Sequence, residues 1–178
     1  MGTATTAFID RDGVINRKPP EGEYVTEPGQ LELLPKAPEA IAKLSRAGLR
    51  TVIVTNQQGV GKGLVGMETV EQINGNILRA VEAQGGRVDQ VLVCPHLEGT
   101  CECRKPRVGL FVEARRRDPG IDFTRSVVIG DSDGDMAAAS AIGARALRVG
   151  PGEPGDDPGE TTVSGLAEAA ELVLEESR

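Results

Sequence analysis

The chain has 178 residues, of which 39% are hydrophobic and 26% charged, and this is typical of a single globular domain. Its net charge of −7, its dispersed basic residues and its aromatic content of only 2% argue against a nucleic-acid partner. No stretch reaches membrane-spanning length and no signal peptide precedes the first strand, so we expect a cytoplasmic protein that does not contact a membrane.

Short apolar strands alternate with helical segments along the chain. The pattern predicts strands at 5–10, 50–55, 88–94, 126–130 and 144–149, and helices at 36–47, 67–84, 109–117, 134–142 and 163–175. Residues 151–160, rich in Gly, Pro and Asp, predict an exposed loop. The strands do not alternate apolar with polar residues, as expected when helices cover both faces of a parallel sheet. We therefore predict one α/β domain over 1–178, with a doubly wound, Rossmann-like parallel sheet of about five strands.

The first predicted strand ends in two acids. Asp10 and Asp12 follow the apolar run Ala7-Phe8-Ile9, and Gly13 allows a sharp turn directly after them. Carboxylates at i and i+2 project to the same side of an extended chain, and burying them costs free energy. A bound cation or a chemical role would explain that cost. The alternative is a turn or helix cap.

Polar residues also end or follow the other strands, or lie between them. They are Thr55, Asn56 and Gln57 after the second strand, Arg104 and Lys105 between the third and fourth, and Asp131 and Asp135 after the fourth. The carboxyl ends of parallel strands share one edge of the sheet, so we expect these side chains to converge in one crevice. Each has a simpler alternative, since Thr55-Asn56 would also suit a turn and Asp131 an N-cap.

This collection of residues suits phosphoryl transfer. Carboxylates without histidine favour Mg²⁺, and a lysine with a hydroxyl group would neutralise and orient phosphate oxygens. One carboxylate can attack phosphorus, while a second can protonate the leaving oxygen and then activate water.

Four segments resemble, in order and spacing, the four motifs of the haloacid dehalogenase superfamily of phosphatases. They are Asp10-Arg-Asp12-Gly13-Val14, Thr55-Asn56-Gln57, Arg104-Lys105-Pro106 and Gly130-Asp131-x-x-x-Asp135. The resemblance extends from about Phe8 to Val149, and the short intervals between the motifs imply that no cap domain is inserted.

The resemblance also implies a role for each matching residue. Asp10 would be the nucleophile that forms an aspartyl-phosphate, and Asp12 the general acid/base. Thr55 and Lys105 would hold the transferring phosphoryl group. Mg²⁺ would be held by Asp10, the backbone carbonyl of Asp12, and Asp131, with Asp135 supporting the metal site from behind.

All three cysteines and the only histidine lie in the segment 94–103. The spacing of Cys94, His96, Cys101 and Cys103 suits a tetrahedral Zn²⁺ site with no open position, which would be structural. An odd number of cysteines makes a disulfide framework a poor explanation, and incidental thiols are the remaining alternative. We expect this zinc to fix the loop that carries Arg104 and Lys105.

The zinc loop is similar to that of the capless, zinc-bearing group of the superfamily, which includes phosphatases of D-glycero-D-manno-heptose 1,7-bisphosphate and of histidinol phosphate. Segments 23–25 and 56–63 look like those of the heptose enzymes, whereas the short zinc loop looks like that of the histidinol enzymes. The resemblance thus implies a phosphorylated sugar, most simply the heptose bisphosphate, with histidinol phosphate as the alternative. The residues expected to bind it are Tyr24, Asn56, Gln57, Gln58, Lys62 and Arg104. Arg104 and Lys62 would hold the second phosphate. We expect a monomer or weak dimer.

Two other functions are disfavoured by the sequence. The segment 61–66 fits the dinucleotide-binding pattern Gly-x-Gly-x-x-Gly, but it begins well after its strand has ended. A non-enzymatic binding protein on the same fold would be expected to lack Asp10 or Asp12, and both are present.

Overall fold

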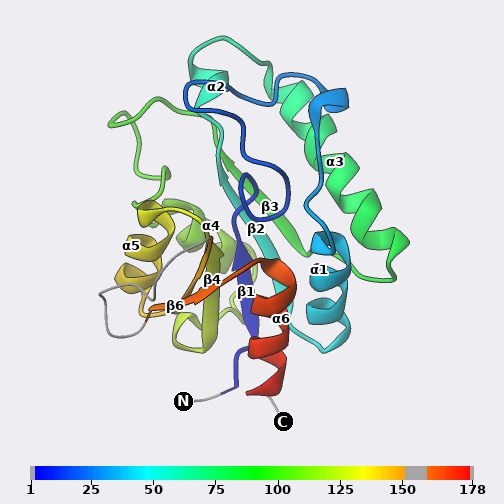
Figure 1. Ribbon diagram of the computed structural model, residues 1–178. Helices are drawn as coiled ribbons and strands as arrows, with labels where there is room; N and C mark the ends of the chain where they lie inside the picture. Colours follow the sequence, from blue (N-terminus) through cyan, green and yellow to red (C-terminus); the bar gives the residue numbers. More distant parts are fainter. Residues whose placement is uncertain (1–2, 151–159, 177–178) are drawn as a thin grey trace.

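A computed structural model describes residues 3–150 and 160–176 of the chain (Figure 1). Its centre is a parallel sheet of six strands in the order β3-β2-β1-β4-β5-β6. The strands are β1 (Thr6–Ile9), β2 (Arg50–Asn56), β3 (Gln90–Cys94), β4 (Ser126–Gly130), β5 (Arg145–Val149) and β6 (Glu160–Val163). The predicted α/β class and the parallel, doubly wound sheet are confirmed.

Helices cover both faces of the sheet. They are α1 (Ala37–Arg46), α2 (Gln58–Gly61), α3 (Met67–Ala83), α4 (Gly109–Arg117), α5 (Asp133–Ile142) and α6 (Leu166–Glu175), with 3₁₀ turns η1 (Pro28–Gln30) and η2 (Phe123–Arg125). Helices α1, α3 and α6 lie on one side of the sheet and α4 and α5 on the other (Figure 1). Among residues 3–150 and 160–176, no helix combines the length and apolarity needed to cross a membrane.

The central strand β1 shows why the sequence pattern is apolar without alternation. Ala7 and Ile9 pack into the cluster beneath α1 and α6, whereas Phe8 points to the opposite face. There its ring meets Phe111 of α4 edge-on, with centroids 4.9 Å apart. All four residues of β1 are buried because both faces are covered.

Two parts of the sequence-based prediction need correction at the C-terminal side. The sheet has six strands rather than about five, because Glu160–Val163 pairs with β5 as β6. The last helix begins at Leu166 rather than at 163. The β-branched run Thr161-Thr162-Val163 favours a strand, and pairing with β5 supplies its partner. Of the loop predicted at 151–160, residues 151–159 lie outside the described residues, and residue 160 begins β6.

The sheet order brings the functional strand ends together. β1 pairs with β2 on one side and β4 on the other, with Thr6 level with both Arg50 and Ser126. The segments that follow β1 and β4, and the end of β2, therefore meet at one edge of the sheet.

Candidate active site

Lys105 links three segments at this edge of the sheet: the residue that follows β1, strand β2 and the first turn of α5. Its Nζ atom donates hydrogen bonds to Asp10 Oδ1 at 2.8 Å, to Asp135 Oδ1 at 2.6 Å and to the carbonyl oxygen of Val54 at 2.8 Å. The lysine is buried, and burial alone would lower its pKa. The charges of Asp10 and Asp135 outweigh burial and raise that pKa, so the ammonium group stays protonated.

Asn56 holds the backbone of this lysine. Its Nδ2 atom donates to the Lys105 carbonyl oxygen, and its Oδ1 atom accepts from the Lys105 N–H, both at 3.1 Å. The last residue of β2 therefore fixes the loop that delivers Lys105 to the sheet edge.

Asp10 lies in an environment that disfavours its charge. Burial raises the pKa of its carboxyl group to about 7, against the opposing effect of Lys105 and with a further increase from Asp135. With this pKa, the Asp10 carboxyl group would be only partly ionised at neutral pH, and a nearby cation would favour its ionised form.

The two predicted acidic metal ligands, Asp10 and Asp131, gather in one cluster with the predicted supporting residue Asp135. One carboxylate oxygen from each of Asp10, Asp131 and Asp135 lies within 4.8 Å of the others. Both oxygens of Asp135 are already engaged, one by Lys105 and the other by Ser132, whose Oγ and N–H donate to it in a capping box at the start of α5. Because both of its oxygens accept hydrogen bonds within the protein, Asp135 suits a residue that supports the metal site rather than one that binds the metal directly.

Asp131 has an oxygen available for a ligand. Its Oδ1 atom is buried and has no hydrogen-bond partner among residues 3–150 and 160–176, while Oδ2 accepts from Lys18 Nζ at 2.6 Å. Gly13 lies against this side chain with φ of +89°, and a Cβ atom there would come within 2.3 Å of Asp131 Oδ2. An orphaned carboxylate oxygen beside two other acids fits a hard divalent cation such as Mg²⁺.

The Asp12 carboxylate is held by donors on both of its oxygens. Oδ1 accepts from Asn16 Nδ2 at 2.9 Å and from Arg11 Nη2 at 3.0 Å, and Oδ2 accepts from Gln57 Nε2 at 2.7 Å. Arg11 is fully buried. Both acids of the first motif line the crevice, and each has its own cationic neighbour.

A hollow of about 290 Å³ opens over these groups. Four of the predicted substrate-binding residues line it, namely Tyr24, Asn56, Gln57 and Arg104. Gln58 and Lys62 are not part of its wall, and the Lys62 ammonium lies 5.2 Å from the centroid of the Tyr24 ring. Arg104 contributes a buried Nη1 atom that has no partner among the described residues.

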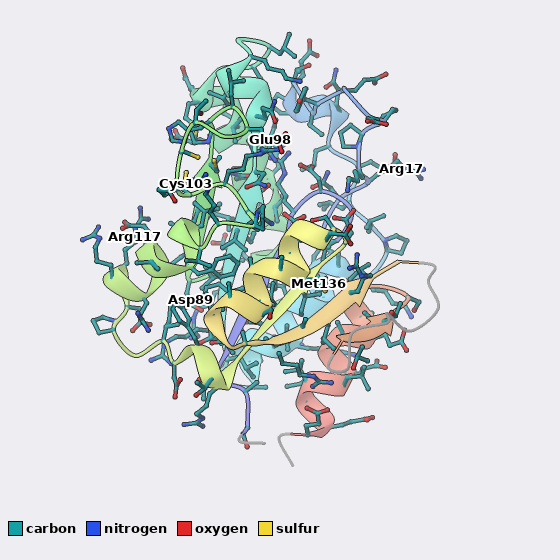
Figure 2. All side chains as sticks on the ribbon, turned by 90° about the vertical axis from the view of Figure 1, so that its left-hand side faces the viewer. Arg17, Asp89, Glu98, Cys103, Arg117 and Met136 are labelled. Carbon is teal, nitrogen blue, oxygen red and sulfur yellow. The ribbon has the colours of Figure 1, made fainter. Side chains whose placement is uncertain are left out.

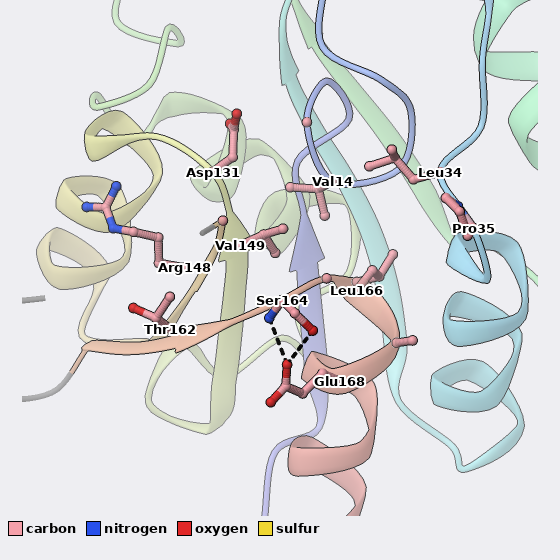
Figure 3. Close-up of a pocket in the computed structure, with 14 residues that line it drawn as sticks. Val14, Leu34, Pro35, Asp131, Arg148, Val149, Thr162, Ser164, Leu166 and Glu168 are labelled. Carbon is pink, nitrogen blue, oxygen red and sulfur yellow. Dashed lines mark hydrogen bonds between the residues drawn. The ribbon is translucent and has the colours of Figure 1, made fainter. Parts of the chain in front are cut away.

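A larger hollow, of about 820 Å³, lies on the other side of Asp131 (Figure 3). Val14, Leu34, Val149 and Leu166 line it, as do Ser164 and Glu168, whose carboxylate accepts from the N–H and hydroxyl of Ser164. Neither Asp10 nor Lys105 reaches it. The smaller hollow is therefore the candidate active site.

The four predicted zinc ligands also converge. The Cys94 and Cys101 sulfurs are 3.6 Å apart, those of Cys101 and Cys103 are 3.4 Å apart, and His96 Nδ1 lies 3.2 Å from Cys103. Ligands about 2.3 Å from one tetrahedral ion lie roughly 3.8 Å from each other, so this donor set fits Zn²⁺. Figure 2 shows Cys103 on the same loop as Glu98, away from Met136 of α5.

The cysteine loop contacts the lysine loop directly. The Arg104 N–H points at Cys101 Sγ, 3.4 Å away. On its other side the loop packs against α2, where a Cβ atom at Gly61 would come within 2.8 Å of the Pro95 carbonyl oxygen. A metal bound by these cysteines would therefore stabilise both the Lys105 loop and the wall of the crevice.

Sequence reasoning missed several residues of this site. Lys18 contacts Asp131, Asn16 contacts Asp12, and Asn74 contacts Arg11. Only Asn74 leaves a signal in the sequence, because it interrupts the apolar stripe of Val70, Ile73 and Ile77 on α3. Lys18 and Asn16 lie in an irregular loop, where no periodicity indicates which side chains turn inward.

The chain is similar to proteins of known family. Residues 102–175 match the family model described as HAD-hydrolase-like. The D-glycero-beta-D-manno-heptose-1,7-bisphosphate 7-phosphatase of Rhodopseudomonas palustris is 40% identical over 150 residues, covering 80% of this chain and 81% of that protein. The D-glycero-alpha-D-manno-heptose-1,7-bisphosphate 7-phosphatase of Mycobacterium bovis is 42% identical over 140 residues, covering 78% and 73%.

A solved structure agrees over almost the whole chain. The D,D-heptose 1,7-bisphosphate phosphatase of Bordetella bronchiseptica, crystallised with magnesium and phosphate, superposes with a TM-score of 0.86 at 33% identity. The match covers 96% of this chain and 99% of that one.

Proposed function

The chain belongs to the heptose-1,7-bisphosphate 7-phosphatase family of the haloacid dehalogenase superfamily, and from this premise we propose that it removes the 7-phosphate of D-glycero-D-manno-heptose 1,7-bisphosphate. It is a phosphoric monoester hydrolase. The observation that carries the proposal is the buried Lys105 ammonium, which joins the Asp10 carboxylate to Asp135 at the floor of a polar crevice.

In the first step, an Asp10 oxygen attacks phosphorus and the bond from phosphorus to the sugar oxygen breaks. The phosphoryl group is then carried by Asp10 as an acyl phosphate. Lys105 and the Thr55 hydroxyl would neutralise and orient the remaining phosphoryl oxygens. Both groups lie in the interior, where such interactions are stronger than in water.

Asp12 moves the protons of the reaction. Its carboxylic acid gives a proton to the leaving sugar oxygen, and the resulting carboxylate then takes a proton from the attacking water. Water adds to phosphorus, the bond to Asp10 breaks, and inorganic phosphate leaves with Asp10 restored. Asp12 gives up a proton in the first step and regains one in the second, so it ends each turnover in the protonation state in which it began.

The acidic cluster would hold Mg²⁺ through Asp10, Asp131 and the backbone carbonyl of Asp12. Bound there, the ion would offset the negative charge that gathers when a carboxylate approaches a phosphate dianion. The buried, unpartnered Asp131 Oδ1 supports this assignment, and so does the magnesium with which the Bordetella phosphatase was crystallised.

The second phosphate of the substrate needs its own cation. Arg104 supports that role, because its buried Nη1 atom lines the crevice without a partner among the described residues. Arginine can bind phosphate through two parallel hydrogen bonds. The Lys62 ammonium lies over the Tyr24 ring and outside the wall of the crevice, so it would act on this phosphate at longer range.

The Cys94, His96, Cys101 and Cys103 cluster would hold one structural Zn²⁺. With four protein ligands the ion has no open position for substrate, so its role would be to stabilise the loop. The contact between Cys101 and the Arg104 backbone supports a function in ordering Arg104 and Lys105.

Phosphate release tests the proposal directly. With Mg²⁺ present, the α or β anomer of heptose 1,7-bisphosphate should be turned over better than histidinol phosphate, and ³¹P NMR should show that the 1-phosphate remains. Asp10→Asn should abolish turnover, whereas Asp133→Asn, which changes an exposed acid in the first turn of α5, should not. Preference for histidinol phosphate would contradict the substrate, and turnover by Asp10→Asn within a few-fold of the parent would contradict the nucleophile.

A further inference from the structure

Gln57 was expected from the sequence to bind substrate, but its side-chain amide is fully occupied by the protein. Nε2 donates to Asp12 Oδ2 at 2.7 Å and to Thr55 Oγ1 at 2.8 Å, and Oε1 accepts from Arg11 Nη2 at 3.0 Å. Gln57 is 2% exposed. Both of its amide hydrogens are therefore committed before any substrate enters.

The chemistry of the partners fixes the orientation of this amide. A guanidinium group can only donate, so the Gln57 oxygen must face Arg11. With the oxygen facing Arg11, the nitrogen faces Asp12 and donates to its Oδ2 atom. The second hydrogen of that nitrogen then points at the Thr55 oxygen.

This arrangement also orients the Thr55 hydroxyl. Because its oxygen accepts from Gln57, its own hydrogen must point elsewhere. Among the hydrogen bonds of residues 3–150 and 160–176, none takes that hydrogen to a protein acceptor. The hydroxyl hydrogen is therefore available to the phosphoryl group that Asp10 would carry.

Arg11 and Asn74 anchor the amide from beneath. Arg11 is fully buried, and its Nη1 atom donates to Asn74 Oδ1 at 3.2 Å on the buried face of α3. Asp12 supplies the carboxylate that pairs with the buried guanidinium. A chain of hydrogen bonds therefore leads from Asn74 of α3 through Arg11 to the Gln57 amide. The amide in turn contacts two groups of the proposed reaction, the Asp12 carboxylate and the Thr55 hydroxyl.

We propose that Gln57, held by Arg11 and Asn74, is a positioning residue that sets the general acid/base Asp12 and aims the Thr55 hydroxyl at the phosphoryl group. This inference rests on the phosphatase function proposed above. Since a shift of about 1 Å in a catalytic group can cost about 10²-fold in rate, Gln57→Met should lower kcat by ~10–100-fold. KM should change less than about threefold, because no substrate contact is removed.

The test compares Gln57→Met and Asn74→Leu with Asn76→Leu, a control on the same helix and away from this chain of hydrogen bonds. Steady-state kinetics are measured with heptose 1,7-bisphosphate and with 4-nitrophenyl phosphate, and folding is checked by circular dichroism. Both test variants should lose kcat, Asn74→Leu by less, and the loss should be larger for the sugar phosphate, whose leaving oxygen needs a proton. Asn76→Leu should match the parent.

Two results would overturn the proposal. A rise in KM at constant kcat for Gln57→Met would make Gln57 a substrate contact, and parental kinetics in both test variants would remove the positioning role. If Gln57→Met does not fold, Asn74→Leu decides, because it leaves Gln57 itself intact. Failure of the parent to hydrolyse the sugar bisphosphate would instead contradict the proposed function, so the two failures are distinguishable.

Discussion

The Nζ atom of Lys105 lies 2.8 Å from Asp10 Oδ1, although 95 positions separate the two residues in the chain. The same ammonium group lies 2.6 Å from Asp135. One buried cation thus pairs with two buried carboxylates, and its removal would leave their charge uncompensated in the interior.

Lys105→Met should therefore reduce both activity and stability. Removing one partner of a buried ion pair costs about 3–5 kcal/mol, because the remaining charge is left uncompensated. Urea unfolding in the presence of a chelator measures this cost. The matched control is Lys43→Met, which removes an exposed ion pair with Glu171 and should cost less than about 1 kcal/mol. Equal stability of the two variants would contradict the account.

Magnesium binding should depend on pH through Asp10. Burial raises the pKa of this carboxyl group to about 7, and only the ionised form can bind the metal. Protons therefore compete below pH 7, and the affinity for Mg²⁺ should fall about tenfold per pH unit there. Above pH 7 Asp10 is already ionised, so the affinity should level off. Calorimetric titrations from pH 5.5 to 8.5 check this, and constant affinity over the range would refute it.

Gly13→Ala should weaken the metal site specifically. A Cβ atom there would come within 2.3 Å of Asp131 Oδ2, so the carboxylate must move. The control is Gly48→Ala, which has nearly the same φ, +91° against +89°, but nothing within 4 Å of the new Cβ. Both variants should lose stability through backbone strain, by about 1 kcal/mol. Only Gly13→Ala should need more Mg²⁺ for half-maximal activity, and an equal Mg²⁺ requirement in both would refute this.

Cys101→Ser should lose zinc without unfolding the domain. The sheet carries the fold, so loss of one ligand should disorder only the loop that ends at Lys105. We expect native circular dichroism, close to one zinc per chain in the parent and none in the variant, and loss of activity even in saturating Mg²⁺. Glu102→Ala, an exposed residue between two ligands, is the control. Absence of zinc from the parent would contradict the zinc site. Full activity in a zinc-free variant would contradict the role of the zinc in positioning the loop.

The strand ends could be predicted because burial and polarity change there within one or two residues. Asp10, Thr55 and Asp131 each follow a fully apolar run, and parallel pairing brings such ends to one edge. The cysteine loop could be predicted because its four ligands lie within ten consecutive residues.

Other features depend on tertiary contacts that leave no local pattern. The contact of Lys18 with Asp131 and the hydrogen bonds that hold Gln57 exist only once loops and α3 are packed. Strand β6 was missed although Thr161-Thr162-Val163 favours a strand locally, because so short a segment becomes a strand only by pairing with β5. The predicted site roles themselves follow from resemblance, and the experiments above test them.

The most direct test of the central claim is to trap the phosphorylated enzyme. Protein mixed with heptose 1,7-bisphosphate and Mg²⁺ is quenched in acid within the first turnover, and the digested peptide that contains Asp10 is analysed by mass spectrometry. We expect one phosphoryl group on Asp10, absent without Mg²⁺, absent from Asp10→Asn, and accumulating in Asp12→Asn, where water attack lacks its base. A phosphoryl group on another residue, or steady turnover with no adduct on Asp10 in either the parent or Asp12→Asn, would contradict the account.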